Sequence, residues 1–160
     1  MSISEVIRRE PTTLSPDDTV GRAAELLRKE HVLSLPVVED GKLVGMFGLH
    51  DLVRLLMPRA VTLTGQGLDS LTDLDFVVDS LEEVRSRMQD VGRTRVGKHL
   101  ERGSGRTPLD PDSSFTEALF LVYRLGRDLP VVEKGTGRLA GMVSPWDVLD
   151  RLGQGGRGDG

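Results

Sequence analysis

The chain has 160 residues, of which 38% are hydrophobic and 29% charged, and a formal net charge of −4, which indicates a folded protein of one compact domain or two small modules. The acidic balance and the 4% share of aromatic residues argue against a nucleic-acid or anionic-membrane binder, and the lack of cysteine excludes disulfides, thiolate zinc sites and a cysteine nucleophile. The apolar runs are too short for a membrane span and the first residues lack the pattern of a secretory signal, so we expect a cytoplasmic protein that is not inserted in a membrane.

The first 59 residues carry the signals of a β-α-β-β-α unit. A strand is expected around residues 12–14, and Ser15-Pro16 places a capping side chain before a proline, which predicts a helix start. Two further strands, at 35–38 and 43–47, flank the hairpin signal Asp40-Gly41, and a second helix begins at Gly48. The apolar residues of the first helix have the i, i+3, i+4, i+7 spacing of an amphipathic helix: Val20, Ala23, Ala24 and Leu27.

Residues 60–95 form a connector with a different pattern. Seven acidic side chains lie between Ala60 and Asp90, whereas five basic side chains lie between Val91 and Arg106. The capping box Ser80-Leu81-Glu82-Glu83 predicts a short helix that ends at about Asp90. We interpret this segment as a solvated connector, with a phosphate-facing or partner-facing patch as the alternative.

Residues 96–152 repeat the first unit. Three blocks return in the same order at offsets of 95, 94 and 96 residues, namely 12–18 as 107–113, 35–39 as 129–133, and 45–51 as 141–147. Such a steady offset indicates a duplication. The second copy predicts a helix after Asp110-Pro111, strands at 129–132 and 139–143, and a helix from Ser144. The apolar face of its first helix comprises Phe115, Ala118, Leu119 and Val122, and a glycine-rich tail, 153–160, should be flexible.

These blocks resemble the CBS domain, arranged as a tandem pair or Bateman module. The resemblance rests on the Leu-Pro-Val-Val strand, the hairpin that follows it, and the element glycine–hydrophobic–hydrophobic–Ser/Thr–x–x–Asp. It implies an α/β (α+β) fold in which two βαββα repeats, 1–59 and 96–152, pack through their sheets. It also implies adenosyl ligands in clefts between the repeats, a regulatory role and homodimerisation.

The second copy holds the more complete ligand site. By the resemblance, Asp147 matches the ribose-binding aspartate and Ser144 the phosphate-contacting hydroxyl, and a carboxylate is suited to accept hydrogen bonds from ribose hydroxyls. The alternative is that Ser144 and Asp147 simply cap the helix, and both roles are compatible. Arg127 would attract a phosphate, whereas its neighbour Asp128 would repel one. The adenine pocket is expected from Thr107, Pro108, Leu109, Leu129 and Pro130.

The first copy predicts a weaker second site. Asp51 is present, but Gly48 stands where the hydroxyl is expected. The remaining site residues of this copy are Thr12, Thr13, Leu14, Leu35 and Pro36. The histidines lack metal-ligand spacing, and neither a nucleophile elbow nor a Walker loop is present, so we expect no metal, no catalytic cofactor and no enzyme activity.

Two functions follow from the sequence. The first is a regulatory module that binds AMP, ADP, ATP or an S-adenosylmethionine-like compound and acts on a separate effector protein. The second is a ligand-free module that only dimerises or docks a partner. The homodimer is expected through the apolar faces of the helices that follow Asp51 and Asp147: Leu52, Leu55, Leu56, Val148, Leu149 and Leu152.

Overall fold

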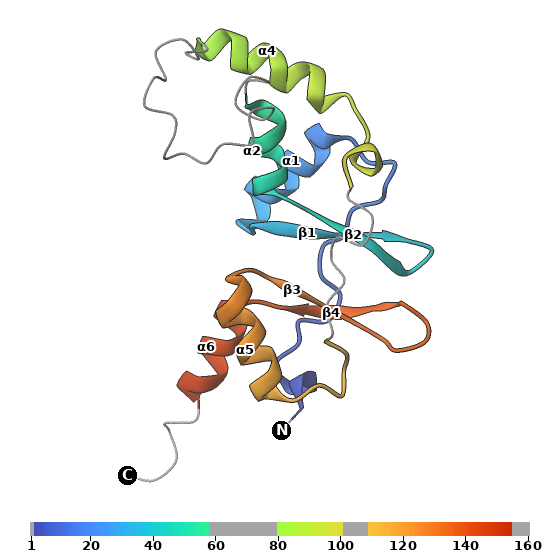
Figure 1. Ribbon diagram of the computed structural model, residues 1–160, viewed down its shortest axis with the longest axis vertical. Helices are drawn as coiled ribbons and strands as arrows, with labels where there is room; N and C mark the ends of the chain where they lie inside the picture. The colour runs from blue at the N-terminus through green and yellow to red at the C-terminus, as the bar shows by residue number, and fades with distance from the viewer. Residues whose placement is uncertain (1, 58–79, 101–108, 155–160) are drawn as a thin grey trace.

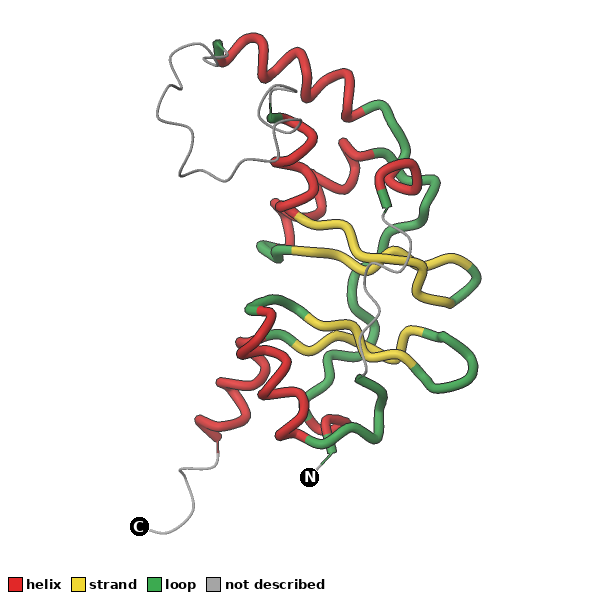
Figure 2. The backbone as a smooth tube through the Cα atoms, in the orientation of Figure 1, coloured by secondary structure: helices red, strands yellow, loops and turns green. Residues whose placement is uncertain are grey.

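The computed structural model describes residues 2–57, 80–100 and 109–154, which form two layered halves with their sheets facing each other and their helices outside (Figures 1 and 2). The first half contains α1 (Val20–Glu30), β1 (Ser34–Glu39), β2 (Lys42–Gly48), α2 (Leu49–Leu56) and α4 (Leu81–Gly92). The second half contains α5 (Phe115–Leu125), β3 (Leu129–Val132), β4 (Leu139–Val143) and α6 (Pro145–Gln154). Two short 3-10 helices, η1 (Ile3–Glu5) and η4 (Val96–His99), complete the described elements.

Each half is built on an antiparallel hairpin whose register the turn sets. In the first half β1 pairs with β2, and Asp40 and Gly41 both have positive φ, 52° and 77°, as a tight hairpin turn requires. In the second half β3 pairs with β4 through a longer turn. The expected first strand is reduced to one bridge in the first half, where Leu14 pairs in parallel with Val37. The α+β fold of two repeats packed through their sheets is thereby confirmed.

The two halves exchange short segments. Ile3 is fully buried in the core of the second half, and its N–H donates to the Ser113 carbonyl at 2.9 Å. Val96 is fully buried in the core of the first half, and its N–H donates to the Asp18 carbonyl at 2.8 Å. Each core is therefore completed by a segment that lies, along the chain, before the other repeat. Figure 1 shows this directly, since the N-terminus lies beside the second half.

The two hairpin turns also touch. The Leu43 N–H donates to the Gly137 carbonyl at 3.0 Å, and the Leu139 N–H donates to the Gly41 carbonyl at 3.2 Å. Lys42 and Arg138 form an antiparallel bridge between the repeats. Backbone hydrogen bonds thus join the two sheets at their hairpin turns. The helices lie at the other end of the strands (Figure 2).

The predicted helix starts are wrong by four residues. Helix α1 begins at Val20, where the Thr19 hydroxyl accepts the Arg22 N–H, and α5 begins at Phe115, where the Ser114 hydroxyl accepts the Glu117 N–H. Ser15 and Asp110 instead stabilise the turns that precede these helices. The prolines that follow them are compatible with a helix start. The residues that cap the helices are instead Thr19 and Ser114, whose hydroxyls lie one position before the first apolar residue of each helix. On α5, Leu119 is 41% exposed and does not belong to the buried face.

The predicted helix in the connector is confirmed, because α4 begins with the reciprocal hydrogen bonds of Ser80 and Glu83. It packs on α1 and α2. The acidic stretch 60–79, the segment 101–108 and residues 155–160 of the tail lie outside the described residues. Among the described helices, none combines the length and the apolar character that crossing a bilayer requires.

Candidate functional site

The turn from β4 into α6 is fixed by a capping box. The Ser144 N–H donates to Asp147 Oδ2 at 2.7 Å, and the Asp147 N–H donates to Ser144 Oγ at 3.1 Å. Ser144 is buried and Asp147 is half-buried, so both side chains are held in one orientation at the start of the helix. The capping interpretation is confirmed. It leaves the second carboxylate oxygen, Asp147 Oδ1, without a hydrogen-bond partner among the described residues.

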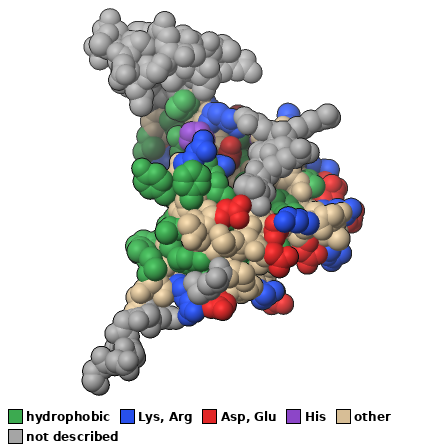
Figure 3. Space-filling view, turned by 60° about the horizontal axis from the view of Figure 1, so that its bottom comes forward, with side chains coloured by type: hydrophobic (Ala, Val, Ile, Leu, Met, Phe, Trp, Pro, Cys, Tyr) green, Lys and Arg blue, Asp and Glu red, His purple; other side chains and the backbone are tan. Residues whose placement is uncertain are grey.

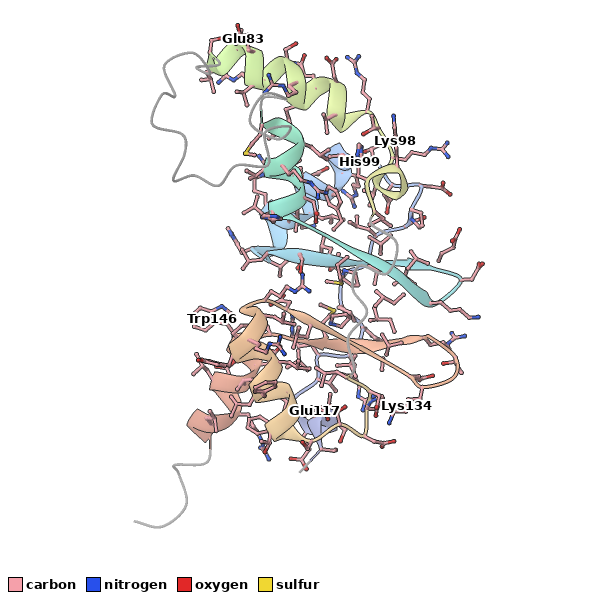
Figure 4. The ribbon with its side chains drawn as sticks, in the orientation of Figure 1. Glu83, Lys98, His99, Glu117, Lys134 and Trp146 are labelled. Carbon is pink, nitrogen blue, oxygen red and sulfur yellow. The ribbon has the colours of Figure 1, made fainter. Side chains whose placement is uncertain are left out.

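A cavity of about 240 Å³ lies in front of this turn. Its walls come from both repeats: the end of α1, the approach to β3, and the start of α6. Trp146 is 73% exposed and stands at the rim, on the side where the two halves face each other (Figure 4). The lining residues are Arg8, His31, Val32, Leu33, Gly126, Arg127, Asp128, Ser144, Pro145, Trp146 and Asp147.

Two carboxylates and one guanidinium meet inside this cavity. Arg8 Nε donates to Asp147 Oδ2 at 3.0 Å, and Arg8 Nη2 lies 3.5 Å from Asp128 Oδ2. Burial raises the pKa of Asp128 above its usual range and the Asp147 carboxylate adds to this, while Arg8 opposes both. Arg127 also lines the cavity and has no ion-pair partner among the described residues. The repulsion of an anion expected from Asp128 is therefore offset by a neighbouring cation.

A smaller cavity of about 40 Å³ adjoins the first and shares Arg8, Val32 and Asp128 with it. Thr12, Leu35 and Pro36, which the sequence assigns to the weaker site of the first copy, line this smaller cavity. The structure thus brings the apolar strand of the first repeat to the same cleft as the Ser144–Asp147 turn. Of the other residues assigned to that weaker site, Thr13 is exposed and Leu14 is buried in the first core.

The equivalent turn in the first repeat is closed by its own backbone. The Gly48 N–H donates to Asp51 Oδ2 at 2.8 Å, and the Leu49 N–H donates to the Leu33 carbonyl at 2.8 Å. A Cβ on Gly48 would lie 2.6 Å from that Leu33 oxygen, which explains why no hydroxyl-bearing residue fits here. Asp51 also pairs with Arg54 at 3.4 Å and is not among the residues that line either cavity.

The remaining residues expected in the adenine pocket lie deeper. Leu109 and Leu129 belong to the core of the second half, with 1% and 0% exposure, and Pro130 is buried. Thr107 and Pro108 lie outside the described residues. Of the residues expected at the site, the structure brings Arg127, Ser144 and Asp147 together around one cavity.

Sequence reasoning missed Arg8. It reaches the cleft because the Arg8 N–H donates to the Met142 carbonyl at 2.8 Å and the Met142 N–H donates to the Arg8 carbonyl at 3.0 Å. The duplicated blocks begin at Thr12, so the repeat pattern does not include this residue. The only available signal was the basic pair Arg8-Arg9 before the first block.

Among the described residues, no cluster of three histidine, aspartate or glutamate side chains is placed to hold a metal ion.

Comparison with known proteins identifies the class. The family model for the CBS domain matches residues 3–58 and 107–154, which together exceed half of the chain, so the protein belongs to the CBS domain family and carries two copies of the domain.

A relative from Methanocaldococcus jannaschii, uncharacterized protein MJ0188, is 27% identical over 150 residues, covering 93% of this chain and 43% of its own length. The chain spans about half the length of the curated relatives it matches.

Solved structures share the fold. The CBS-pair protein CBSX2 from Arabidopsis thaliana aligns with a TM-score of 0.73 at 21% identity, covering 99% of this chain and 98% of that one. A structure of CBSX2 in complex with AMP aligns with a TM-score of 0.68 at 22% identity, covering 98% of both chains. At this level of identity the likeness shows a common fold.

Proposed function

We propose that the protein is a cytoplasmic regulatory module that binds an adenine nucleotide or adenosyl compound in the cleft between its repeats and acts on a separate effector protein. The observation that carries this proposal is the cavity of about 240 Å³ that gathers Arg127, Ser144 and Asp147 from the second repeat against residues 31–33 of the first. Its volume is close to the lower end of the roughly 300–1,000 Å³ typical of ligand pockets.

The residues that line the cavity offer partners for the three parts of a nucleotide, namely the ribose, the phosphate and the base. The free Oδ1 of Asp147 is an acceptor for a ribose hydroxyl. The unpaired guanidinium of Arg127 is a donor for an anion, and guanidinium groups bind phosphate through two parallel hydrogen bonds. The exposed ring of Trp146 and the side chains of Val32 and Leu33 offer apolar surface to a base. The AMP complex of the structurally similar CBSX2 supports the same class of ligand.

A thermal-shift screen with AMP, ADP, ATP, S-adenosylmethionine and NAD tests the proposal. A ligand that binds only the folded state stabilises it by about 2.7 kcal/mol at 100 times its dissociation constant, so a genuine ligand raises Tm in a concentration-dependent manner. Loss of this shift in Asp147→Ala, together with its retention in Asp51→Ala, would place the ligand in the cleft described here. No shift with any of the five compounds would favour the ligand-free alternative.

The helices also support a homodimer. Hydrophobic side chains gather along one side of the molecule in both halves (Figure 3). Of the residues predicted for the dimer face, Leu149 and Leu152 are exposed, whereas Leu52 and Val148 are buried in the two cores and Leu55 and Leu56 pack against the first. On α5 and α6, several large apolar side chains are more than 40% exposed: Leu119, Phe120, Tyr123, Leu125, Trp146, Leu149 and Leu152. Apolar patches of this kind usually mark an interaction surface. We propose that a second copy of the chain covers them, which is compatible with both the ligand-binding and the ligand-free alternatives.

A further inference from the structure

Arg8 occupies one carboxylate oxygen, Oδ2, of Asp147, the residue proposed to bind a ligand's ribose through its other oxygen. Two hydrogen bonds join the backbone of Arg8 to that of Met142 on β4, and they fix the point from which its side chain enters the cleft. The Arg8 side chain is 42% exposed, whereas the Asp147 and Asp128 side chains that it contacts are only 16% and 11% exposed. The arginine is therefore the more solvent-exposed member of this cluster, and its two carboxylate partners are the more buried ones.

The acceptor sites of Asp147 are unevenly used. Oδ2 already accepts the Ser144 N–H at 2.7 Å and Arg8 Nε at 3.0 Å, whereas Oδ1 accepts nothing from the described residues. Each carboxylate oxygen has about two lone-pair sites, so Oδ2 is full. A ribose that engages both oxygens through its two hydroxyls finds Oδ1 open but must displace Arg8 from Oδ2.

We propose that Arg8 is the specificity-determining residue of the cleft, holding Asp147 in the empty protein and transferring its guanidinium to the phosphate when a nucleotide binds, so that phosphorylated adenosine is selected over the nucleoside. This inference rests on the proposed function. A phosphate compensates the displaced guanidinium with charge-assisted, bidentate hydrogen bonds. A nucleoside breaks the same contact with Asp147 and supplies no anion in return.

The charged side chains that line the cavity are compatible with this exchange. Arg8 and Arg127 line it together with Asp128 and Asp147, so two positive and two negative side chains are present there. When the neutral ribose takes over Asp147 Oδ2, the contact of Arg8 Nη2 with Asp128 at 3.5 Å keeps the guanidinium at the cleft mouth. The cation is then next to Arg127, and the two together form a site for one phosphate group.

Isothermal titration calorimetry with AMP and adenosine tests the inference on three proteins: wild type, Arg8→Met and Arg9→Gln. Arg8→Met keeps the aliphatic stem and the backbone bonds to Met142 but removes the charge. Arg9→Gln removes the same charge from the adjacent residue, which lines neither cavity. We expect wild type and Arg9→Gln to bind AMP at least about tenfold more tightly than adenosine, since hydrogen bonds between charged groups are worth that factor or more.

In Arg8→Met we expect the preference for AMP to fall to within a few-fold, with adenosine bound at least as tightly as by wild type because the competitor for Asp147 is gone. Equal weakening of both ligands in Arg8→Met, or an unchanged preference for AMP over adenosine, would overturn the inference and leave the proposed function standing. If wild type binds none of these compounds, the proposed function and the inference both fail. Circular dichroism of each variant confirms that it is folded.

Discussion

At the scale of single residues, Asp51 and Asp147 make the same hydrogen bond at the start of α2 and α6 but have different neighbours. Asp51 accepts the Gly48 N–H at 2.8 Å and Asp147 accepts the Ser144 N–H at 2.7 Å, so each carboxylate caps its own helix. Asp147 lines the cavity of about 240 Å³ between the repeats, whereas Asp51 lines neither of the two cavities described above. The difference between the two copies therefore lies in what each carboxylate can reach.

Asp147→Ala and Asp51→Ala should therefore lose similar helix-cap stability, about 1 kcal/mol each, but differ in ligand binding. We expect Asp147→Ala to weaken adenosyl binding at least about tenfold, because a hydrogen bond to a charged group contributes roughly 1.5–3 kcal/mol. Asp51→Ala should change the affinity by less than a few-fold. Calorimetry on both folded variants measures this, and the opposite ranking would assign the site to the first repeat.

The folded protein disfavours protonation of His99, because its pKa is lowered there. Its Nε2 lies 2.7 Å from Thr94 Oγ1, and that hydroxyl donates to the Val91 carbonyl, so Nε2 carries the proton of this hydrogen bond. Burial lowers the pKa of His99, and the nearby charges of Lys98 and Arg54 lower it further. Figure 4 shows His99 beside Lys98 at η4, on the outer side of the first half.

The sign of the pH effect follows. Because the pKa of His99 is lower in the folded than in the unfolded state, the unfolded chain takes up this proton first as the pH falls. The stability due to neutral His99 is complete above its ordinary pKa of about 6.5 and is lost as the pH falls through that value toward the folded pKa. Urea titrations at pH 7.5 and 5.5 should show a smaller loss of stability for His99→Gln than for wild type. An equal or larger loss in the variant would contradict this assignment.

How far the sequence predicts the site depends on the range of the interactions. The Ser144–Asp147 turn and the hairpin at Asp40-Gly41 were predictable because their hydrogen bonds and backbone angles are local. Arg8 was not predictable, because its partner Asp147 lies 139 positions away and no local pattern marks the pairing. The resemblance implied a cleft between the repeats, but the residues of the first copy that line it, 31–33, were not predictable, because they meet the start of α6 only in the folded chain.

At the scale of elements, Gly48 is the last residue of β2 and pairs with Ser34, the first residue of β1. An added Cβ would lie 2.6 Å from the Leu33 oxygen and 2.9 Å from Ser34 Cβ, which is closer than side chains are normally found. Gly48→Ala should destabilise the protein by about 1–3 kcal/mol, the usual range for overpacking. Gly92→Ala is the control, because its added Cβ would meet only Gly21 and Met88 atoms at 3.7 Å or more. Thermal unfolding compares the two, and equal Tm values would show that β1 can move aside.

The burial of Ile3 in the core of the second half predicts that this residue contributes to the stability of the protein. Ile3→Ala should reduce the free energy of unfolding by about 2–5 kcal/mol, as expected for a fully buried isoleucine, although it lies in a 3-10 helix of only three residues. Leu81→Ala, at a side chain that is 67% exposed on α4, should change it by less than about 0.5 kcal/mol. Urea unfolding monitored by circular dichroism gives both values. A small effect of Ile3→Ala would mean that residues 2–8 dock only weakly.

The helix starts show where local rules compete. Pro16 and Pro111 are acceptable in a first helical turn, and a hydroxyl or carboxylate before each strengthens that interpretation. In the structure, the Asp17 N–H donates to Ser15 Oγ and the Asp112 N–H donates to Asp110 Oδ1, so these side chains close turns instead. The apolar periodicity from Val20 and from Phe115 was the better guide, because burial of that stripe decides where each helix begins.

At the scale of the whole molecule, large apolar side chains of α5 and α6 are exposed to solvent, and the proposed homodimer would bury them. A chain of 17.5 kDa has little spare volume in which to bury them internally. We expect light scattering at tens of micromolar to report twice the chain mass. Leu149→Glu combined with Leu152→Glu should convert the protein to monomers, because a charge buried without a counter-ion is strongly disfavoured. A wild-type monomer at that concentration would contradict the proposed dimer.

The exchange of Ile3 and Val96 between the two cores has a consequence for cooperativity. A piece of the chain cut between the repeats would separate each core from one of its own buried residues. We therefore expect the pair to unfold as one thermodynamic unit, without an independent melting transition of either repeat. The contact between Ile3 and Ser113 joins residues more than a hundred positions apart, so we expect it to form slowly relative to the hairpins. Occupancy of the cleft should then protect amide protons in both sheets alike, including those on the side farthest from the ligand.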